Sequence, residues 1–455
     1  MIKYNPGDDI MSAKSRTTAD KARAFSAAAI AVMIVINFFV SFHGRAKPAT
    51  DSYEPRQNVE TVPTEKPDTP ESARINEVSR AKISVTGDVI IHNPLLNSAK
   101  VSKNEYNFNY IYKYLKSYAT ASDYAVTNLE TTLGGSDYTG YPVFSTPDSL
   151  IDSITDAGFD MLLTANNHAN DTGFKGMSRT AKVLNEKRVD FIGTVENESD
   201  KRYLVKDVNG IKLGMVCYTY EGRARTDGMK YLNGIMNKKS AAIINTFNVR
   251  NLDEFYTELG QHIDAMKSEG AEAIIVYIHW GEEYELEPNS SQKKMAQKLC
   301  DMGVDVIVGG HPHVVQPMKL LTSKTDSSHK TVCIYSIGNS VSNQRKNYMK
   351  LKTGHTEDGV FISFTFSKYS NGKVIVSDVD IIPTWVNMYN AKSRKIFEII
   401  PLDKSVSDWK ESFSLDDTAK KDANASYKRT MKIVGDGLQD SQEYCRHSAE
   451  EILKK

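Results

Sequence analysis

The sequence of 455 residues has few cysteines and no excess of charge of either sign. Its cysteines lie far apart without a CxxC pair, which indicates buried thiols rather than a disulfide framework or a cysteine zinc site: Cys217, Cys300, Cys333 and Cys445. Lysine plus arginine and aspartate plus glutamate both number 57, so the formal net charge is zero and no nucleic-acid partner is expected. The 40% hydrophobic and 25% charged residues are typical of a globular protein.

One long apolar run lies near the amino terminus. Residues 24–42 are apolar except for two serines and one asparagine, close to the roughly 20 residues that cross a bilayer. Basic residues precede this run, so we expect residues 1–23 to be a cytoplasmic tail, the run to be a transmembrane signal anchor, and the remainder to be extracellular. A cleaved signal peptide is the alternative, although the small-residue cleavage sites after the run are poor. These features predict a single-pass protein of the cell membrane.

Three further segments differ in composition. Residues 46–81 contain five prolines among threonine, glutamate, aspartate and serine, which predicts a disordered linker. Patterns of strands and helices then fill residues 82–385, which we expect to fold as one domain. Residues 386–455 are predicted to be a polar, mostly helical C-terminal extension.

Residues 271–317 predict a βαβ unit. An apolar run ends in His279, a helical pattern follows, and a second apolar run leads through two glycines to His311 and His313. The two strands of such a unit are parallel, so both end at the edge of the sheet where ligands bind in open α/β proteins. A single histidine at a strand end is usually a structural, hydrogen-bonded residue. Three at one edge predict a metal site.

Other expected strands also end in side chains that bind metals or transfer protons: Asp88, Glu130, Asn167 and His168. Two asparagine–glycine pairs, at 209–210 and 371–372, predict hairpins that add antiparallel strands to the alternation of strands and helices. We therefore expect an α/β protein in which two mixed sheets pack face to face with helices outside.

Six short motifs occur in a specific order along the chain: Gly87-Asp88, Asn128-Leu129-Glu130, Asn166-Asn167-His168, His279-Trp280-Gly281, Gly310-His311-Pro312-His313 and Ser336-Ile337-Gly338-Asn339. This order resembles that of the CapA family of poly-γ-glutamate capsule synthesis proteins, which looks like a relative of the calcineurin-like metallophosphoesterases. The resemblance covers roughly residues 82–383. It implies the four-layer α/β/β/α sandwich of the metallophosphoesterases, and the anchor before the domain also fits the family.

The resemblance implies one or two divalent metal ions, with Mn, Fe or Zn suiting the mixed ligands best, held by Asp88, Glu130, Asn167, His279, His311 and His313. His168 matches the histidine that protonates the leaving group, and we expect Asp171 to orient it, an exposed turn aspartate being the alternative. Two positions depart from the superfamily. Position 90 is isoleucine where the Asp-x-His histidine stands, with His92 as a candidate substitute, and Glu130 replaces an aspartate. Both departures concern the first metal site, so the inference that we favour is one site formed by Glu130, Asn167, His279 and His311.

Four residues near these motifs are expected to contact the substrate: Asn128, Trp280, Glu282 and Asn339. For Glu282, as for Glu283 and Glu285 in the same segment, a solvated loop is the alternative to a lip that contacts cationic or amide groups of a substrate. The expected function is synthesis, export or attachment of an anionic surface polymer of the poly-γ-glutamate type, by metal-assisted hydrolysis or transfer at a phosphoester or amide. The alternatives are a non-catalytic scaffold of a polymer synthase or export complex and a general phosphodiesterase. Expected partners are the membrane, the anionic polymer or phosphoester substrate, and membrane-bound synthase subunits.

Overall fold

The structure is a computed structural model, and it describes residues 74–222, 229–392 and 394–454. These residues belong to one compact unit, Pro70–Lys455. The expected cytoplasmic tail (1–23) and signal anchor (24–42) lie outside the described residues, as does most of the expected linker (46–81). Within the described ranges, no helix combines the length and the apolar character needed to cross a membrane.

The first sheet has eight strands in the order β15-β14-β13-β1-β2-β3-β4, with β12 paired to the end of β1. The strands are β1 Glu77–Val89, β2 Tyr124–Leu129, β3 Met161–Leu163, β4 Asp190–Ile192, β12 Asn339–Val341, β13 Asp358–Tyr369, β14 Val374–Ala391 and β15 Arg394–Pro401. β1 to β4 are parallel and β13 to β15 are antiparallel, so the sheet is mixed. The carboxyl ends of β1, β2 and β3 therefore share one edge.

The second sheet has seven strands in the order β10-β11-β9-β8-β6-β5, with β7 paired to β6. The strands are β5 Leu204–Val208, β6 Ile211–Tyr220, β7 Thr246–Phe247, β8 Ala273–His279, β9 Val306–Gly310, β10 Met318–Thr322 and β11 Lys330–Ile334. β6, β8, β9 and β11 are parallel, whereas β5 and β10 are antiparallel to their neighbours. β5 and β6 meet at the predicted hairpin, where Asn209 and Gly210 both have positive φ.

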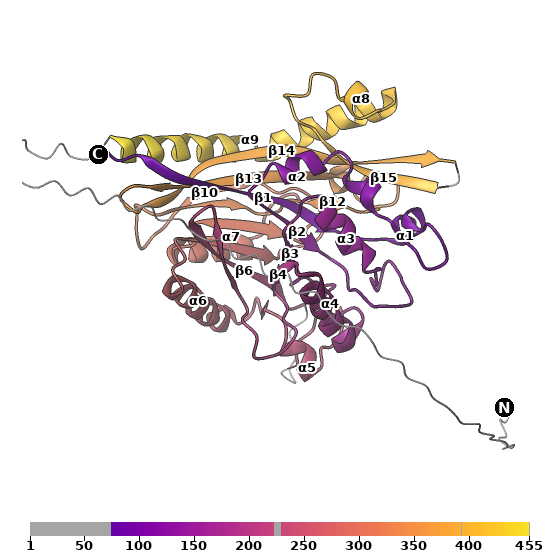
Figure 1. Cartoon of the computed structure of the whole chain (residues 1–455), viewed down its shortest axis with the longest axis horizontal. Helices are drawn as coiled ribbons and strands as arrows, with labels where there is room; N and C mark the ends of the chain where they lie inside the picture. The colour runs from indigo at the N-terminus through magenta and orange to yellow at the C-terminus, as the bar shows by residue number, and fades with distance from the viewer. Residues whose placement is uncertain (1–73, 223–228, 393, 455) are drawn as a thin grey trace, which may run out of the picture. The chain divides into compact units, whose positions relative to one another are not determined.

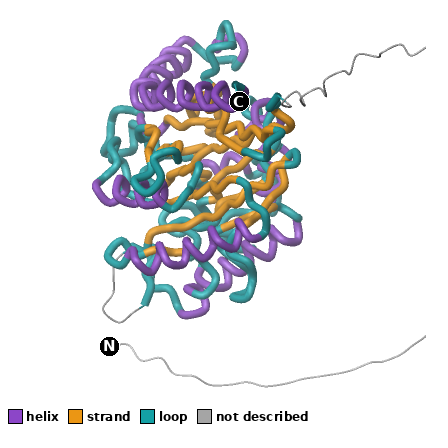
Figure 2. The backbone as a smooth tube through the Cα atoms, turned by 90° about the vertical axis from the view of Figure 1, so that its left-hand side faces the viewer, coloured by secondary structure: helices purple, strands orange, loops and turns teal. Residues whose placement is uncertain are grey.

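Helices cover the outer faces of both sheets (Figures 1 and 2). The helices are α1 Asn93–Ala99, η1 Asn109–Tyr112, α2 Lys116–Thr120, α3 Ser149–Asp156, α4 Gly173–Lys187, α5 Lys238–Ala241, α6 Leu252–Ser268, α7 Ser290–Asp301, η2 His355–Glu357, α8 Trp409–Ser412 and α9 Asp417–Leu453. α7 begins at a capping box in which Asn289 and Gln292 bond to each other's main-chain N–H. α1 and α3 pack on the first sheet, and α6 and α7 pack on the second.

The core lies between the two sheets. Val85 and Val126 from the first sheet and Met215 and Ile275 from the second belong to one buried apolar cluster. Burial of these inward-facing apolar residues holds the two sheets face to face through the hydrophobic effect. The expected α/β fold of two mixed sheets is confirmed. All four cysteines are buried free thiols, as the spacing predicted.

Two boundaries differ from those expected from the sequence. β1 begins at Glu77 and pairs with β13 from there on, so the last residues of the expected linker, 46–81, form a strand. The expected boundary between 385 and 386 falls inside β14, which continues into β15. The exposed faces of these strands carry polar residues, so the strands do not form continuous apolar runs in the sequence.

The C-terminal helix α9 is part of the fold. Its residues Val434, Leu438 and Cys445 join the core between the sheets. Gly437 lets the helix approach β10 closely, because a Cβ there would lie 1.9 Å from the main-chain oxygen of Met318. The helix therefore closes one side of the sandwich instead of extending away from it.

Candidate metal centre

Loops from both sheets bring the predicted ligands together at one edge. Asp88 is the penultimate residue of β1, His279 ends β8, and the loops after β2, β3 and β9 supply the others. All six predicted metal ligands are at most 3% exposed, and each lies near at least one other: Asp88, Glu130, Asn167, His279, His311 and His313. The parallel strands of both sheets run toward this edge, which is the physical reason for the convergence.

The first group of ligands contains Asp88, Glu130 and His313. His313 Nδ1 lies 3.2 Å from Asp88 Oδ2, and His313 Nε2 lies 3.8 Å from Glu130 Oε1. One ligand atom from each of the three residues lies within 4.8 Å of the others. The group can therefore hold a metal ion without a histidine at position 90, which is a buried isoleucine.

The second group adjoins the first through Glu130. His279 Nε2 lies 2.9 Å from Asn167 Oδ1 and 3.7 Å from Glu130 Oε1. The rings of His279 and His311 have their centres 4.8 Å apart. Glu130 thus faces ligands of both groups.

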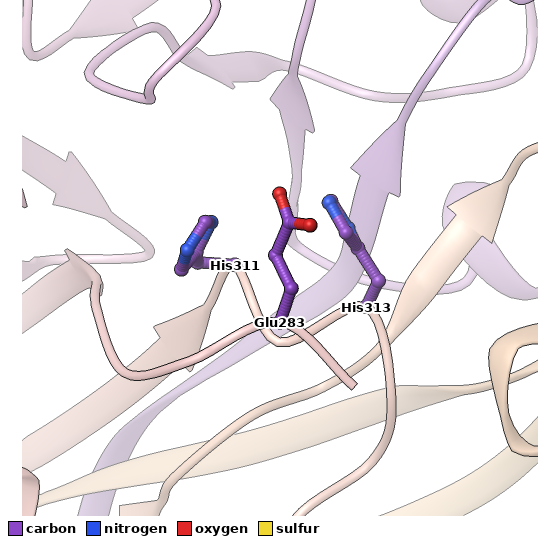
Figure 3. Close-up of side chains that lie close together, drawn as sticks. All are labelled: Glu283, His311 and His313. Atoms are coloured by element: carbon purple, nitrogen blue, oxygen red, sulfur yellow. The ribbon is translucent and has the colours of Figure 1, made fainter. Parts of the chain in front are cut away.

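Glu283, in the loop after β8, adds a carboxylate that sequence reasoning assigned only to a solvated loop or substrate lip. Its ligand atom lies within 4.8 Å of those of His311 and His313. Figure 3 shows the Glu283 carboxylate between the two rings. The indication in the sequence was the run of glutamates that follows His279, but nothing in the run distinguishes Glu283 from its neighbours.

The main chain is strained at the His-x-His motif. His311 has φ of 94° and His313 has φ of 55°, both in the left-handed region that residues other than glycine seldom adopt. Gly309 serves a close approach, because a Cβ there would lie 2.0 Å from the main-chain oxygen of Tyr335. The two glycines were expected to permit the turn, but the unusual conformation falls on the histidines themselves.

Burial sets the charge state of the centre. Burial raises the pKa of the Glu130 carboxyl well above its usual range, and the neighbouring Asp88 carboxylate adds to the effect. Burial lowers the pKa of His279 and of His311 well below the usual value, and the other imidazoles of the site act in the same direction. Both imidazoles are therefore neutral at neutral pH, the form that binds metals.

Two buried atoms of the centre lack a hydrogen-bond partner, Glu130 Oε1 and His311 Nδ1. Buried polar atoms are nearly always paired, so these two indicate a ligand that the polypeptide does not supply. Carboxylate oxygen, amide oxygen and imidazole nitrogen suit Mn, Fe or Zn. The side chains present therefore fit a divalent metal ion.

Asn128, predicted to contact substrate, holds the carboxylates instead. It is 5% exposed, and its Nδ2 donates to Asp88 Oδ1 at 2.7 Å and to Glu130 Oε2 at 3.3 Å. Asn166 Nδ2 donates to Asn128 Oδ1 at 3.1 Å, and Asn166 Oδ1 accepts from the main-chain N–H of His168. Asn166 was not singled out from the sequence, although it stands first in the paired asparagines before His168.

Trp280 and Asn339, which were also expected to contact substrate, are both buried. The Trp280 side chain packs in the core at 1% exposure, and its indole N–H donates to the main-chain oxygen of Tyr335 at 2.8 Å. Asn339 is fully buried, with its Oδ1 3.2 Å from His313 Nδ1. Asn339 has no exposed surface for a substrate and orients His313 instead, whereas Trp280 borders the cavity beside His311, where its contact with substrate stays a prediction.

His168 is oriented by Asp171. His168 Nδ1 lies 2.8 Å from Asp171 Oδ2, which also accepts the main-chain N–H of Phe144 at 2.7 Å. The side chain of Asp171 is only 2% exposed, so it is not an exposed turn residue. The Phe144 ring meets the imidazole edge-on, with ring centres 4.6 Å apart. The ring of His168 is thus fixed on two sides.

Two of the larger cavities formed by the described residues lie beside the centre. One, of about 580 Å³, is lined by Asn167, His168 and His313 and has aromatic walls formed by Tyr141, Phe144, Tyr231, Tyr284 and Tyr348. The other, of about 540 Å³, is lined by His311 and the exposed Glu282, as expected of a residue at a substrate lip. Glu283 and Tyr284 border both cavities.

His92, the candidate for the missing histidine, lines the aromatic cavity but does not join either ligand group. Its Nδ1 accepts the main-chain N–H of Asn343 at 3.2 Å. Burial, with a smaller contribution from His313, lowers its pKa to about 4, so the ring is neutral at neutral pH. His92 therefore supports the loop after β12 and is not a metal ligand.

The chain is similar to bacterial capsule synthesis proteins. Residues 82–344 match the family model described as bacterial capsule synthesis protein PGA_cap, a range that includes every predicted site residue. The capsule biosynthesis protein CapA of Bacillus anthracis is 28% identical over 275 residues, covering 59% of this chain and 61%, less than two thirds, of that protein. The PGA biosynthesis protein CapA of Bacillus subtilis (strain 168) is 27% identical over 323 residues, covering 68% of this chain and 77% of the relative. Among solved structures, the sulfate thiohydrolase SoxB of Thermus thermophilus in complex with glycerol aligns with a TM-score of 0.37 and 12% identity, over 77% of this chain and 60% of that one.

Proposed function

The chain belongs to the family of the bacterial capsule synthesis protein PGA_cap, and from this premise we propose that it is a metal-dependent hydrolase or transferase that acts on an anionic surface polymer. The observation that carries the proposal is the convergence of buried carboxylates, imidazoles and an amide around two unpartnered atoms, Glu130 Oε1 and His311 Nδ1. A capsule polymer of the poly-γ-glutamate type is the substrate we propose, and its amide bond the group that reacts.

The proposal includes a location. The apolar run at residues 24–42 supports anchoring in the cell membrane, and the basic residues before it support a cytoplasmic amino terminus. The folded unit would then lie outside the cytoplasm, where a surface polymer is exported and attached. Membrane-bound synthase subunits are the partners that this location suggests.

The centre would hold a divalent ion through two sets of side chains. Asp88, Glu130 and His313 form one set, and Asn167, His279 and His311 adjoin it. A divalent ion bound there supplies Lewis-acid activation of a carbonyl or phosphoryl oxygen. The neutral imidazoles and the buried carboxylates provide the donors, and Asn128 and Asn339 keep them in place.

His168 is the residue that we propose handles the proton. Its Nδ1–H donates to Asp171, so Nε2 is the ring atom left to hold a proton for the leaving amine or alcohol. Phe144 packs against the ring and, with the tyrosines of the cavity wall, limits access of water to it. This is the arrangement in which a carboxylate stabilises an imidazolium at the moment of proton transfer.

A non-catalytic scaffold is the second candidate, and one observation favours it. Position 90 is isoleucine, so the histidine of the metallophosphoesterase Asp-x-His motif is missing. A scaffold would use the folded unit to assemble a synthase and would need neither His168 nor the metal. In cells, a scaffold with His168→Asn should still support polymer production, whereas a catalyst should lose it.

The first test is the metal content of the full-length protein. We expect one or two equivalents of Mn or Zn in the wild type and their loss in His279→Ala/His311→Ala. A matched control is His329→Ala/His447→Ala, because both of these histidines lie outside the centre. If the wild type binds no metal after purification with Mn and Zn, the hydrolase proposal is refuted and the scaffold remains.

A further inference from the structure

The aromatic cavity over the metal centre has no lysine or arginine among its described lining residues, although the proposed substrate is a polyanion. Its walls instead present tyrosine rings, which suit neutral amide and methylene groups. A lysine side chain lies at the edge of the cavity. Lys395 Nζ donates to Tyr348 Oη at 3.0 Å and lies 5.2 Å from the centre of the same ring.

Further cations surround this contact. Lys350 and Lys352 are exposed and follow Tyr348 in the same loop. Four residues of chain span at most about 14 Å, so both lie near the cavity mouth. We call Lys350, Lys352 and Lys395 the rim cations.

The rim cations are not neutralised by the protein. In the part of the chain that the structure describes, none of the three forms an ion pair. Carboxylates near the loop are already engaged. Glu357 pairs with the buried Arg345 at 3.0 Å, and Asp422 on α9 pairs with Lys346 at 3.1 Å. These two pairs fix the loop to the body of the protein, and the charges of the rim cations are not paired with a carboxylate.

We propose that the rim cations form a binding track for an extended polyanionic chain that leads into the aromatic cavity. The inference rests on the proposed function and adds to it the surface that receives the polymer. The formal net charge of the chain is zero, so attraction of a polyanion requires a local concentration of cations. Carboxylates spaced along a polymer would bind the track, while its amides pass the tyrosines.

The position of the track favours a polymer over an anionic membrane. Tyr348 is both a wall of the cavity and the partner of Lys395, so a chain held by the cations continues into the cavity. The track also lies beyond residues 82–344, the range matched by the family model. It is therefore a feature of this chain in addition to the family motifs.

The test measures binding of fluorescein-labelled poly-γ-glutamate to the full-length protein by anisotropy. The test variant replaces the rim cations with glutamine: Lys350→Gln/Lys352→Gln/Lys395→Gln. The matched control removes the same charges from the exposed face of α9, where the residues likewise form no ion pair within the described ranges: Lys421→Gln/Lys428→Gln/Lys432→Gln.

We expect the rim variant to bind roughly tenfold more weakly at low salt, since each exposed charge contributes a few-fold, and its binding to depend less on salt. The control should bind like the wild type. The inference is overturned if both variants weaken alike, if the rim variant binds normally, or if the wild type does not bind the polymer. It is also overturned if the rim variant loses binding to phosphatidylglycerol vesicles but keeps binding to the polymer.

Metal content of the same samples separates this inference from the proposed function. The rim variant should keep the metal of the wild type. If the wild type binds polymer through the rim cations but holds no metal, the track stands and the hydrolase proposal fails. If metal is bound and the rim cations do not affect polymer binding, the inference of a binding track is refuted and the hydrolase proposal is unaffected.

Discussion

Glu130 is the side chain whose substitution best separates folding from metal binding. It is fully buried, its Oε1 has no partner, and its Oε2 accepts only the 3.3 Å bond from Asn128 Nδ2. Burial raises its pKa, and the nearby Asp88 carboxylate raises it further. Without metal, the protein must therefore either bury an unpaired charge or bind a proton. Glu130→Gln removes that requirement and keeps the size of the side chain.

The direction of the stability change follows from this pKa. Because the folded-state pKa lies above the ordinary value of 4.5, the contribution of Glu130 to stability is full below that pH and is lost as the pH rises toward the folded-state pKa. The loss at pH 7 is at most about 3.5 kcal/mol, from 2.5 pH units at about 1.4 kcal/mol each. We expect metal-free Glu130→Gln to be more stable than the wild type at pH 7 by about 1–3 kcal/mol, with the advantage gone below pH 4.5.

With metal the order should reverse. Glu130 Oε1 lies 3.7 Å from His279 Nε2 and 3.8 Å from His313 Nε2, so it faces both groups of ligands. A ligand at one hundred times its dissociation constant stabilises a protein by about 2.7 kcal/mol. A neutral amide cannot supply the anionic oxygen, so Glu130→Gln should lose most of this stabilisation.

The assay is urea unfolding at pH 7 and at pH 4.5, in EDTA and in excess Mn²⁺. The matched control is Glu398→Gln, which alters a buried carboxyl with a raised pKa outside the centre. The control should keep the full effect of Mn²⁺. The reasoning is refuted if Glu130→Gln is less stable than the wild type without metal, or if Mn²⁺ stabilises both proteins equally.

Three further predictions concern the proton-transfer pair, a buried histidine and the packing of α9. Asp171→Asn should reduce polymer production in cells about as strongly as His168→Asn while leaving the metal content unchanged, because it frees the ring without touching a ligand; normal production would contradict this. Burial lowers the pKa of His92 to about 4, so its contribution to stability is full above pH 6.5 and is lost as the pH falls to about 4. The unfolding free energy of His92→Asn should therefore fall less over this range, by at most about 3.5 kcal/mol, and parallel curves would count against the assignment. Gly437→Ala should lower stability by about 1–3 kcal/mol in calorimetry, since its Cβ would lie 1.9 Å from a main-chain oxygen of β10, whereas Gly435→Ala, with open space at that position, should not.

The ligands that end strands could be predicted from the sequence. Apolar runs identify the parallel strands, and parallel strands deliver their last residues to one edge whatever their order in the sheet. His279 ends β8 as expected, and Asp88 is the penultimate residue of β1. Both positions follow from chain direction and the period of the strand.

The roles of the supporting side chains could not be predicted in this way. Asn128 and Asn339 have the residue types of substrate contacts, yet their amides are fully used inside the protein. Glu283 stands in a loop whose path depends on packing against the rest of the fold. Such roles depend on which loops meet in space, and local sequence does not encode these long-range contacts.

The missing histidine at position 90 has a structural answer in His313. The ring of His313 lies between the carboxylates of Asp88 and Glu130, with Nδ1 toward the first and Nε2 toward the second. Asn339 Oδ1 also faces Nδ1, so Nδ1 carries the proton and Nε2 is left as the donor atom. The first group of ligands is therefore complete with two carboxylates and one imidazole. Isoleucine at position 90 leaves the centre without the histidine that the resemblance implies, but the remaining side chains still fit a divalent ion, so the absence is weak support for a purely scaffolding role.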